Sequence, residues 1–109
     1  MKLPSDSIIA PGKLTEYLLK WRPENDKCGF LAQAGYVLEN WERLLRDIRE
    51  QILPLEAHFV ETTDYGEVYE IRGLLLGPSG VELNVVTIWM TERASKQTKF
   101  ITLYRDRRV

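Results

Sequence analysis

Hydroxyl, aromatic and cationic side chains recur in the last three apolar runs of this 109-residue chain. Strands place alternate residues on one face, and that spacing assigns to one face Glu70, Arg72, Thr87, Trp89, Thr91, Thr102 and Tyr104, with Lys99 near its rim. Aromatic rings can stack a nucleobase, and hydroxyls beside a cation can contact a phosphate. Metal-independent RNA cleavage requires activation of a 2′-hydroxyl and stabilisation of a five-coordinate phosphate, for which Lys, Arg, Tyr and Thr can serve. From this face we take Thr87, Thr102 and Tyr104, together with Lys99, as candidate catalytic residues. Arg72 and Trp89 are the candidate substrate-binding residues.

This candidate site depends on which face of the sheet is open. If Ile88, Ile101 and Leu103 pack beneath the helices, Trp89 and its neighbours face solvent. The alternative is that Trp89 belongs to the core, that Tyr104 is half-buried, and that the threonines are ordinary strand-forming residues. The burial of Trp89 distinguishes the two interpretations.

Other catalytic chemistries lack the residues that they require. The sequence has no P-loop, no dinucleotide-binding fingerprint, no paired histidines and no Cys-x-x-Cys, so we expect neither a cofactor nor a metal site. The single histidine, His58, is far in sequence from the single cysteine, Cys28, which is typical of a small core residue. We expect His58 to contribute little to activity.

Turn signals divide the second half of the chain into four strands. Asp64-Tyr65-Gly66 and Gly77-Pro78-Ser79-Gly80 separate the apolar runs. The pattern predicts strands over 57–62, 67–76, 81–91 and 99–104. The alternation slips at Val85-Val86, where either a β-bulge or burial on both faces explains the pattern.

Helix signals occupy the first half. A stripe of Leu14, Tyr17 and Leu18 predicts a first helix, and Asp26 can cap a second helix that stops at Gly35. Asn40 can cap the longest helix, which Pro54 ends. The apolar stripe of that helix consists of Trp41, Leu44, Leu45, Ile48 and Ile52. We expect this third helix to be the main core element, with Trp41 buried.

These elements predict a single α+β domain over residues 1–109, in which two or three N-terminal helices pack on one face of a four-stranded antiparallel meander. An arm (1–11), a helical part (12–53) and the meander (56–105) follow in order, and the basic tail 105–108 is expected to be a frayed, solvated end. Fifteen Lys and Arg against sixteen Asp and Glu give a net charge of -1, which provides no global attraction to nucleic acid or membranes. No secretory signal and no apolar span is visible, so we expect a cytoplasmic protein that does not bind membranes.

Several segments resemble an uncharacterised family of small bacterial proteins, frequent in cyanobacteria and known as a domain of unknown function. The segments are Lys13–Leu19, Lys27–Leu31, Ala34–Tyr36, Glu39–Glu42, Tyr65–Tyr69, Gly73–Gly80, Val86–Trp89 and Phe100–Tyr104. The family in turn resembles the C-terminal toxin domains of contact-dependent and polymorphic toxin systems, which are grouped with barnase, EndoU, colicin and RelE-type ribonucleases. The resemblance implies a toxin–antitoxin type module whose partners are RNA and a small antitoxin-like protein encoded nearby. It implies active residues that correspond here to Lys27, Thr87, Lys99, Thr102 and Tyr104.

One departure from this family weakens the catalytic interpretation. Relatives carry His-Pro followed by Gly-Lys in the loop before the second helix, whereas residues 22–27 here contain no histidine. Loss of a candidate general base implies reduced catalysis, or a function that never depended on it. We therefore weigh a ribonuclease-like, nucleic-acid-processing domain against a non-catalytic module that binds a small partner protein through the sheet edge or the open face. The near-neutral charge favours the second, and the resemblance favours the first.

Overall fold

A computed structural model of the chain describes residues 1–23 and 27–108, so the cap expected at Asp26 lies outside the described residues. The helical part contains α1 (Pro11–Lys13), the π-helical turn η1 (Leu14–Leu18), α2 (Lys27–Ala32), the 3₁₀ turn η2 (Leu38–Asn40), α3 (Trp41–Asp47) and the π-helical turn η3 (Ile48–Ile52). The strands are β1 (His58–Thr62), β2 (Gly66–Leu76), β3 (Glu82–Glu92) and β4 (Thr98–Arg105). The predicted order of helices followed by strands is confirmed.

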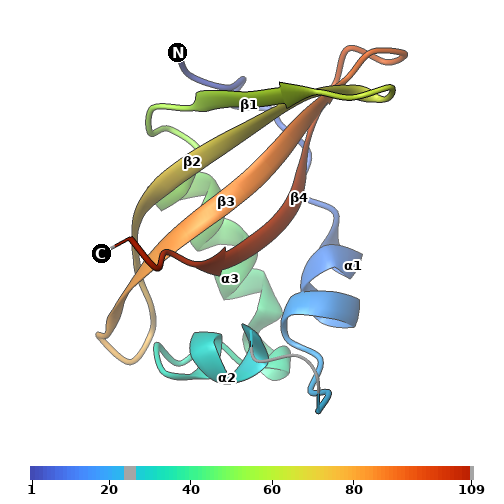
Figure 1. The fold of residues 1–109 in the computed structure, drawn as a ribbon. Helices are drawn as coiled ribbons and strands as arrows, with labels where there is room; N and C mark the ends of the chain where they lie inside the picture. The colour runs from blue at the N-terminus through green and yellow to red at the C-terminus, as the bar shows by residue number, and fades with distance from the viewer. Residues whose placement is uncertain (24–26, 109) are drawn as a thin grey trace.

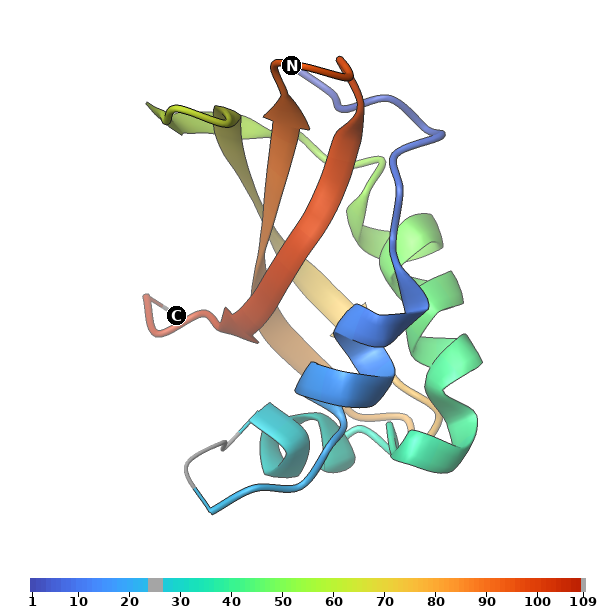
Figure 2. The same ribbon diagram turned by 90° about the vertical axis from the view of Figure 1, so that its right-hand side faces the viewer.

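The strands form one antiparallel sheet in the order β1-β2-β3-β4. Figures 1 and 2 show the described helices on one face of this sheet and none of them on the opposite face. The α+β meander predicted from the sequence is therefore confirmed. Within the described residues, no helix combines the length and the apolar composition that crossing a bilayer requires.

The helix formed by α3 and η3 supplies one side of the core. Leu44, Ile48 and Ile52 are fully buried against the sheet, which confirms the predicted stripe. Trp41 and Leu45 are half-buried and pack against the margin of this cluster. The expectation that Trp41 is buried is therefore wrong, because the stripe turns its centre, and not its first residue, towards β2.

The face assignment of β3 is the main correction to the sequence analysis. Thr87 and Trp89 lie under the helices with no exposed surface. This confirms the alternative in which Trp89 belongs to the core, and the assignment of both residues to an open-face site is wrong. The Trp89 indole N–H donates to Thr87 Oγ1 at 2.8 Å, and Thr87 Oγ1 donates to the Ile71 carbonyl at 3.2 Å. The Trp89 and Phe100 rings meet edge to face at 5.3 Å between centroids. Each buried polar group therefore has a hydrogen-bond partner, which removes most of the cost of burying it.

The slip in alternation at Val85-Val86 comes from burial on both faces. Pairing of β2 with β3 runs without interruption through Gly73↔Val85 and Arg72↔Val86, and both valines are fully buried. The bulge lies instead in β4, where Ile88 pairs with Thr102 and Trp89 pairs with Phe100, leaving Ile101 as the extra residue. Phe100 and Leu103, three residues apart, can therefore both face the core.

The connection from α2 to α3 is built around Gly35. Gly35 has φ +93°, the left-handed conformation that ends a helix, and the Tyr36 N–H donates to the Leu31 carbonyl at 3.2 Å. The predicted stop is confirmed. The prediction that Asn40 caps α3 is wrong, because its side chain makes no capping hydrogen bond to that helix. Instead, Asn40 Oδ1 accepts from the Val37 N–H at 2.8 Å and closes η2.

Both ends of the described chain are anchored. The Arg49 guanidinium donates to the Ser5 and Ser7 carbonyls. Ile8 forms an isolated β-bridge with Lys99 of β4. At the other end, Asp106 is buried and forms an ion pair with Arg72 at 2.9 Å. The expectation of a frayed end is therefore wrong at Asp106, whereas Arg105, Arg107 and Arg108 are exposed to solvent, as predicted. Arg72 and the sheet hold that tail in one place.

Candidate functional site

Three polar side chains from three different elements meet beside β4. The Lys27 ammonium, at the first residue of α2, donates to the Tyr17 hydroxyl oxygen at 2.6 Å and to Thr102 Oγ1 at 3.0 Å. Tyr17 belongs to η1 and Thr102 to β4. The Lys27 nitrogen also lies 4.7 Å from the centre of the Tyr17 ring. We call Tyr17, Lys27 and Thr102 the tyrosine–lysine cluster.

The local structure explains why these side chains converge. In η1, Leu14 and Leu18 are buried, and Tyr17 between them stays 40% exposed. The bulge at Ile101 separates the buried Phe100 and Leu103, so that Thr102 between them reaches the edge of the sheet towards α2. The cluster is therefore open to solvent on a surface whose backbone is fixed by core residues.

The electrostatics of the cluster lower the pKa of Tyr17. The hydrogen bond from Lys27, followed by the one with Thr102, lowers the pKa of Tyr17 below the ordinary tyrosine value. Partial burial opposes this effect. A phenol with a lowered pKa next to an ammonium group is a candidate proton acceptor beside an anion-binding group.

A small depression adjoins Lys27. Its described lining consists of Lys27, Phe30, Tyr104, Arg105 and Arg107, and its volume is about 60 Å³. The Arg105 guanidinium lies over the Phe30 ring, 4.8 Å from its centre. This cation–π contact keeps a positive charge at the mouth of the depression.

A wider depression, of about 580 Å³, shares Phe30, Arg105 and Arg107 with the small one. Trp21, Arg22 and Gln33 add to its lining. We call Arg22, Arg105 and Arg107 the arginine rim. The described residues that line the two depressions include Lys27 and these three arginines, and no acidic residue. Within the described residues, the surface where α2 lies near the end of β4 is therefore cationic, although the net charge of the chain is -1. Figures 1 and 2 show the position of these two elements.

The structure brings together three of the seven predicted site residues. Lys27 and Thr102 are in contact, and Tyr104 lines the same small depression as Lys27. Lys99 lies towards the other end of β4, three residues from Thr102 and thus roughly 10 Å away along the strand at about 3.3 Å per residue. It pairs there with Glu92 at 3.0 Å.

The remaining predicted residues have structural partners. Thr87 and Trp89 are in the core, where neither side chain reaches solvent. Arg72 binds Glu70 and Asp106, and through Asp106 it fixes the tail that carries Arg105 and Arg107. Arg72 therefore positions part of the arginine rim from the open face of the sheet.

Sequence reasoning missed Tyr17 and the arginine rim. The sequence pattern places Tyr17 in an apolar stripe, and it predicts that the tail is a solvated end. Tyr17 and Thr102 are far apart in the sequence, so no spacing rule joins them. The one available signal was local, because Trp21-Arg22 and Tyr104-Arg105 each place an aromatic residue beside an arginine.

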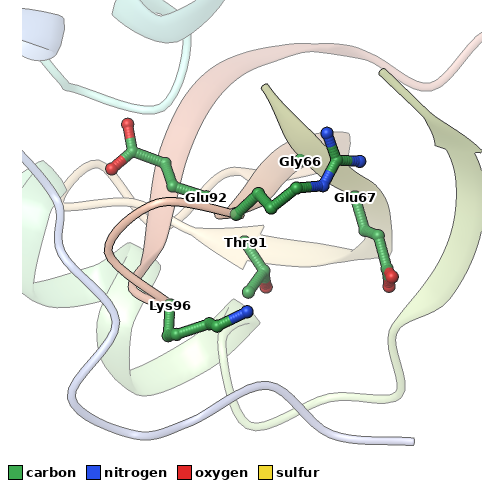
Figure 3. A pocket seen from close by; sticks show the side chains of 6 residues that line it. Gly66, Glu67, Thr91, Glu92 and Lys96 are labelled. Atoms are coloured by element: carbon green, nitrogen blue, oxygen red, sulfur yellow. The ribbon is translucent and has the colours of Figure 1, made fainter. Parts of the chain in front are cut away.

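A separate hollow, of about 270 Å³, lies away from these two depressions, at the tips of the two hairpins that connect β1 to β2 and β3 to β4 (Figure 3). Figure 3 shows the Lys96 and Thr91 side chains turned towards the same space. Both acidic groups here bind side chains outside the lining: Glu67 accepts from the Tyr69 hydroxyl, and Glu92 pairs with Lys99. Arg93 donates to the Thr63 and Asp64 carbonyls and clamps the hairpins together. We therefore assign this hollow a structural role.

The chemistry available at the tyrosine–lysine cluster is that of cations and phenols. Among residues 1–23 and 27–108, no group of three or more His, Cys, Asp or Glu side chains is arranged to hold a metal ion. Cys28 is half-buried, which contradicts its assignment to the core, and its thiol donates to the Leu19 carbonyl at 3.4 Å. The cluster and the rim can bind an anionic ligand and accept or donate protons at Tyr17 and Tyr104.

Comparison with known proteins assigns nearly the whole chain to one family. No curated protein and no solved structure matches the chain. A family model, described as a domain of unknown function (DUF6883), matches residues 2–107, which include every residue of the tyrosine–lysine cluster and of the arginine rim. The chain therefore belongs to the DUF6883 family.

Proposed function

We propose that this chain is an RNA-processing domain of the metal-independent ribonuclease type, and that the tyrosine–lysine cluster is its active site. The observation that carries the proposal is the contact of Lys27 with both Tyr17 and Thr102, next to two depressions lined by arginines. A phosphodiester needs cations around its developing charge, and it needs groups that move protons at the attacking and leaving oxygens. The cluster and Tyr104 supply both kinds of group.

The proposed reaction is transphosphorylation. The 2′-oxygen of RNA forms a bond to phosphorus, the bond from phosphorus to the 5′-oxygen breaks, and a 2′,3′-cyclic phosphate and a 5′-hydroxyl are produced. Tyr17, as the phenolate, accepts the 2′-proton, and Tyr104 donates its phenolic proton to the leaving oxygen. Lys27 stabilises the charge on the phosphoryl oxygens, and Thr102 positions Lys27. Tyr17 takes the place of the histidine that the loop 22–27 lacks.

The proposal extends to the biological setting. We propose that the domain is the toxin-like member of a two-protein module, whose second member is a small antitoxin-like protein encoded nearby. A surface that combines arginines and exposed aromatic residues suits inhibition by an acidic partner, because charge complementarity accelerates association. Growth arrest on expression of the chain, with rescue by the neighbouring gene product, would support this setting.

The catalytic proposal is tested by RNA cleavage with purified variants. We expect Tyr17→Phe and Lys27→Ala each to reduce cleavage of total RNA and of a labelled oligoribonucleotide by about 100-fold, as loss of a proton-transfer group or a charge-stabilising donor does. The matched control is Lys96→Ala, which removes a lysine from the hairpin tips. Lys99→Ala tests whether Lys99, which the sequence analysis places among the active residues, contributes to cleavage. Native circular dichroism must be retained by every variant.

Two results would contradict the proposal in different ways. Cleavage that survives the loss of both Tyr17 and Lys27 would refute the site. Absence of cleavage by the wild-type protein, on structured and unstructured RNA alike, would refute the function.

One observation favours a second candidate function, a non-catalytic interaction module. β1 is one of the two outer strands of the sheet, and all five of its residues are exposed, including Phe59 and Val60. An outer strand of this kind offers backbone N–H and C=O groups to which a partner strand can add. Under this alternative, Val60→Pro abolishes binding of the neighbouring gene product, whereas Tyr17→Phe leaves that binding intact.

A further inference from the structure

We propose that the wider depression beside Trp21 is a subsite for one base of single-stranded RNA, so that the substrate of the tyrosine–lysine cluster is an unpaired strand that crosses the arginine rim. This inference rests on the proposed function, and it names the substrate class of the same site. It makes Trp21 a binding residue.

The first support is the exposure of Trp21. Its side chain is 73% exposed, although a tryptophan normally contributes its large apolar area to a core or an interface. It lines a depression together with Arg22, Phe30 and Gln33. An exposed aromatic ring surrounded by cations is the usual arrangement on which the bases of a single strand stack.

The second support is continuity with the tyrosine–lysine cluster. Phe30, Arg105 and Arg107 line both the wide depression and the small one that contains Lys27 and Tyr104. A phosphate at Lys27 would therefore have a neighbouring phosphate within reach of the rim. Arg105 is held over Phe30, and Arg107 follows the anchored Asp106, so that part of the rim is already ordered.

The geometry favours a single strand over a duplex. A base in a duplex is stacked and paired, and it cannot turn its face to a protein ring without leaving the helix. A single strand presents its bases freely, and the amide of Gln33 can hydrogen-bond the edge of a base. The wide depression, at about 580 Å³, falls within the range of sites that hold small ligands.

The test uses binding, so that it does not depend on cleavage. The probe is a fluorescein-labelled, single-stranded hexanucleotide with 2′-O-methyl riboses, which lacks the attacking hydroxyl, and its affinity is measured by fluorescence anisotropy. We expect Trp21→Ala to weaken binding about 10-fold, within the range for loss of one stacked base, and Trp21→Phe to restore most of the affinity. The matched control is Tyr65→Ala, which removes an exposed aromatic residue, 77% accessible, from the β1–β2 turn at the other end of the molecule. The same hexanucleotide in a duplex should bind more weakly than the single strand.

Each other outcome overturns the subsite. Three results would each show that Trp21 does not select a nucleic-acid strand. They are wild-type affinity in Trp21→Ala, absence of binding by the wild type, and competition by polyglutamate equal to that by the unlabelled hexanucleotide. Trp21-dependent binding of the probe without cleavage of RNA would leave the subsite standing and refute the catalytic function. The two proposals can therefore fail separately.

Discussion

The hydrogen bond between Lys27 and Tyr17 couples the acidity of a phenol to the charge of an amine. The ammonium group lowers the pKa of Tyr17, because it stabilises the phenolate more than the phenol. We expect Lys27→Met to raise the pKa of Tyr17. The measurement is an NMR titration of ring-labelled tyrosine, in which Tyr17→Phe identifies the resonance. Lys96→Met serves as the control, and an unchanged Tyr17 titration in Lys27→Met would show that the contact does not persist in solution.

A second tyrosine, Tyr36, stabilises the fold through a buried hydrogen bond. The Tyr36 hydroxyl donates to Asp47 Oδ2 at 2.6 Å, and the Arg43 guanidinium binds the same oxygen at 2.9 Å. Tyr36 and Asp47 are both buried. Because removal of the hydroxyl leaves a buried carboxylate short of one donor, we expect Tyr36→Phe to lower the free energy of unfolding by about 1–3 kcal/mol. Urea denaturation at neutral pH measures this change.

Alkaline pH provides an independent test of the same contact. Burial, followed by the hydrogen bond to Asp47, raises the pKa of Tyr36. Above the ordinary tyrosine pKa of about 10, the unfolded chain loses this proton while the folded chain keeps it. The stability contribution of Tyr36 is therefore full below about pH 10 and falls as the pH rises further. The excess loss of stability above pH 10 should be smaller in Tyr36→Phe, and an identical pH dependence would refute the assignment.

At the scale of elements, the helix formed by α3 and η3 supports the sheet through its central residues. Ile48 is fully buried and Trp41 only half-buried. We expect Ile48→Ala to cost about 2–5 kcal/mol of unfolding free energy, and Trp41→Ala to cost less than its size suggests. Chemical denaturation of both variants gives the comparison, and a larger loss in Trp41→Ala would refute this packing order.

The elements could largely be predicted from the sequence, whereas the site could not. Turn residues around Gly66 and Gly80 delimit the strands, and Gly35 ends α2, because these signals are local. The assignment of Thr87 and Trp89 to the open face fails because their polar groups have partners inside the core: Trp89 donates to Thr87, and Thr87 donates to the Ile71 carbonyl. Tyr17 and Thr102 meet only when η1 packs beside the bulged β4, which depends on the whole fold.

At the scale of the whole molecule, the distribution of charge matters more than its sum. The arginine rim and Lys27 concentrate positive charge at one end of a chain whose net charge is -1. Binding of the 2′-O-methyl hexanucleotide should therefore weaken with salt, since contacts to phosphates release counterions. We expect Arg107→Ala to reduce the slope of log K against log salt by about 1, and Lys96→Ala to leave it unchanged. A slope that Arg107→Ala does not alter would remove that residue from the phosphate path.

The three tryptophans lie at three depths: Trp89 has no exposed surface, Trp41 is half-buried, and Trp21 is 73% exposed. Indole emission shifts to longer wavelength as water reaches the ring, so each residue emits in its own part of the spectrum. Iodide should quench Trp21 first, helped by the attraction of the anion to the arginine rim, and Trp89 only after unfolding. A Trp41→Phe protein would then report occupancy of the surface and integrity of the core in one unlabelled sample, through two separable optical signals.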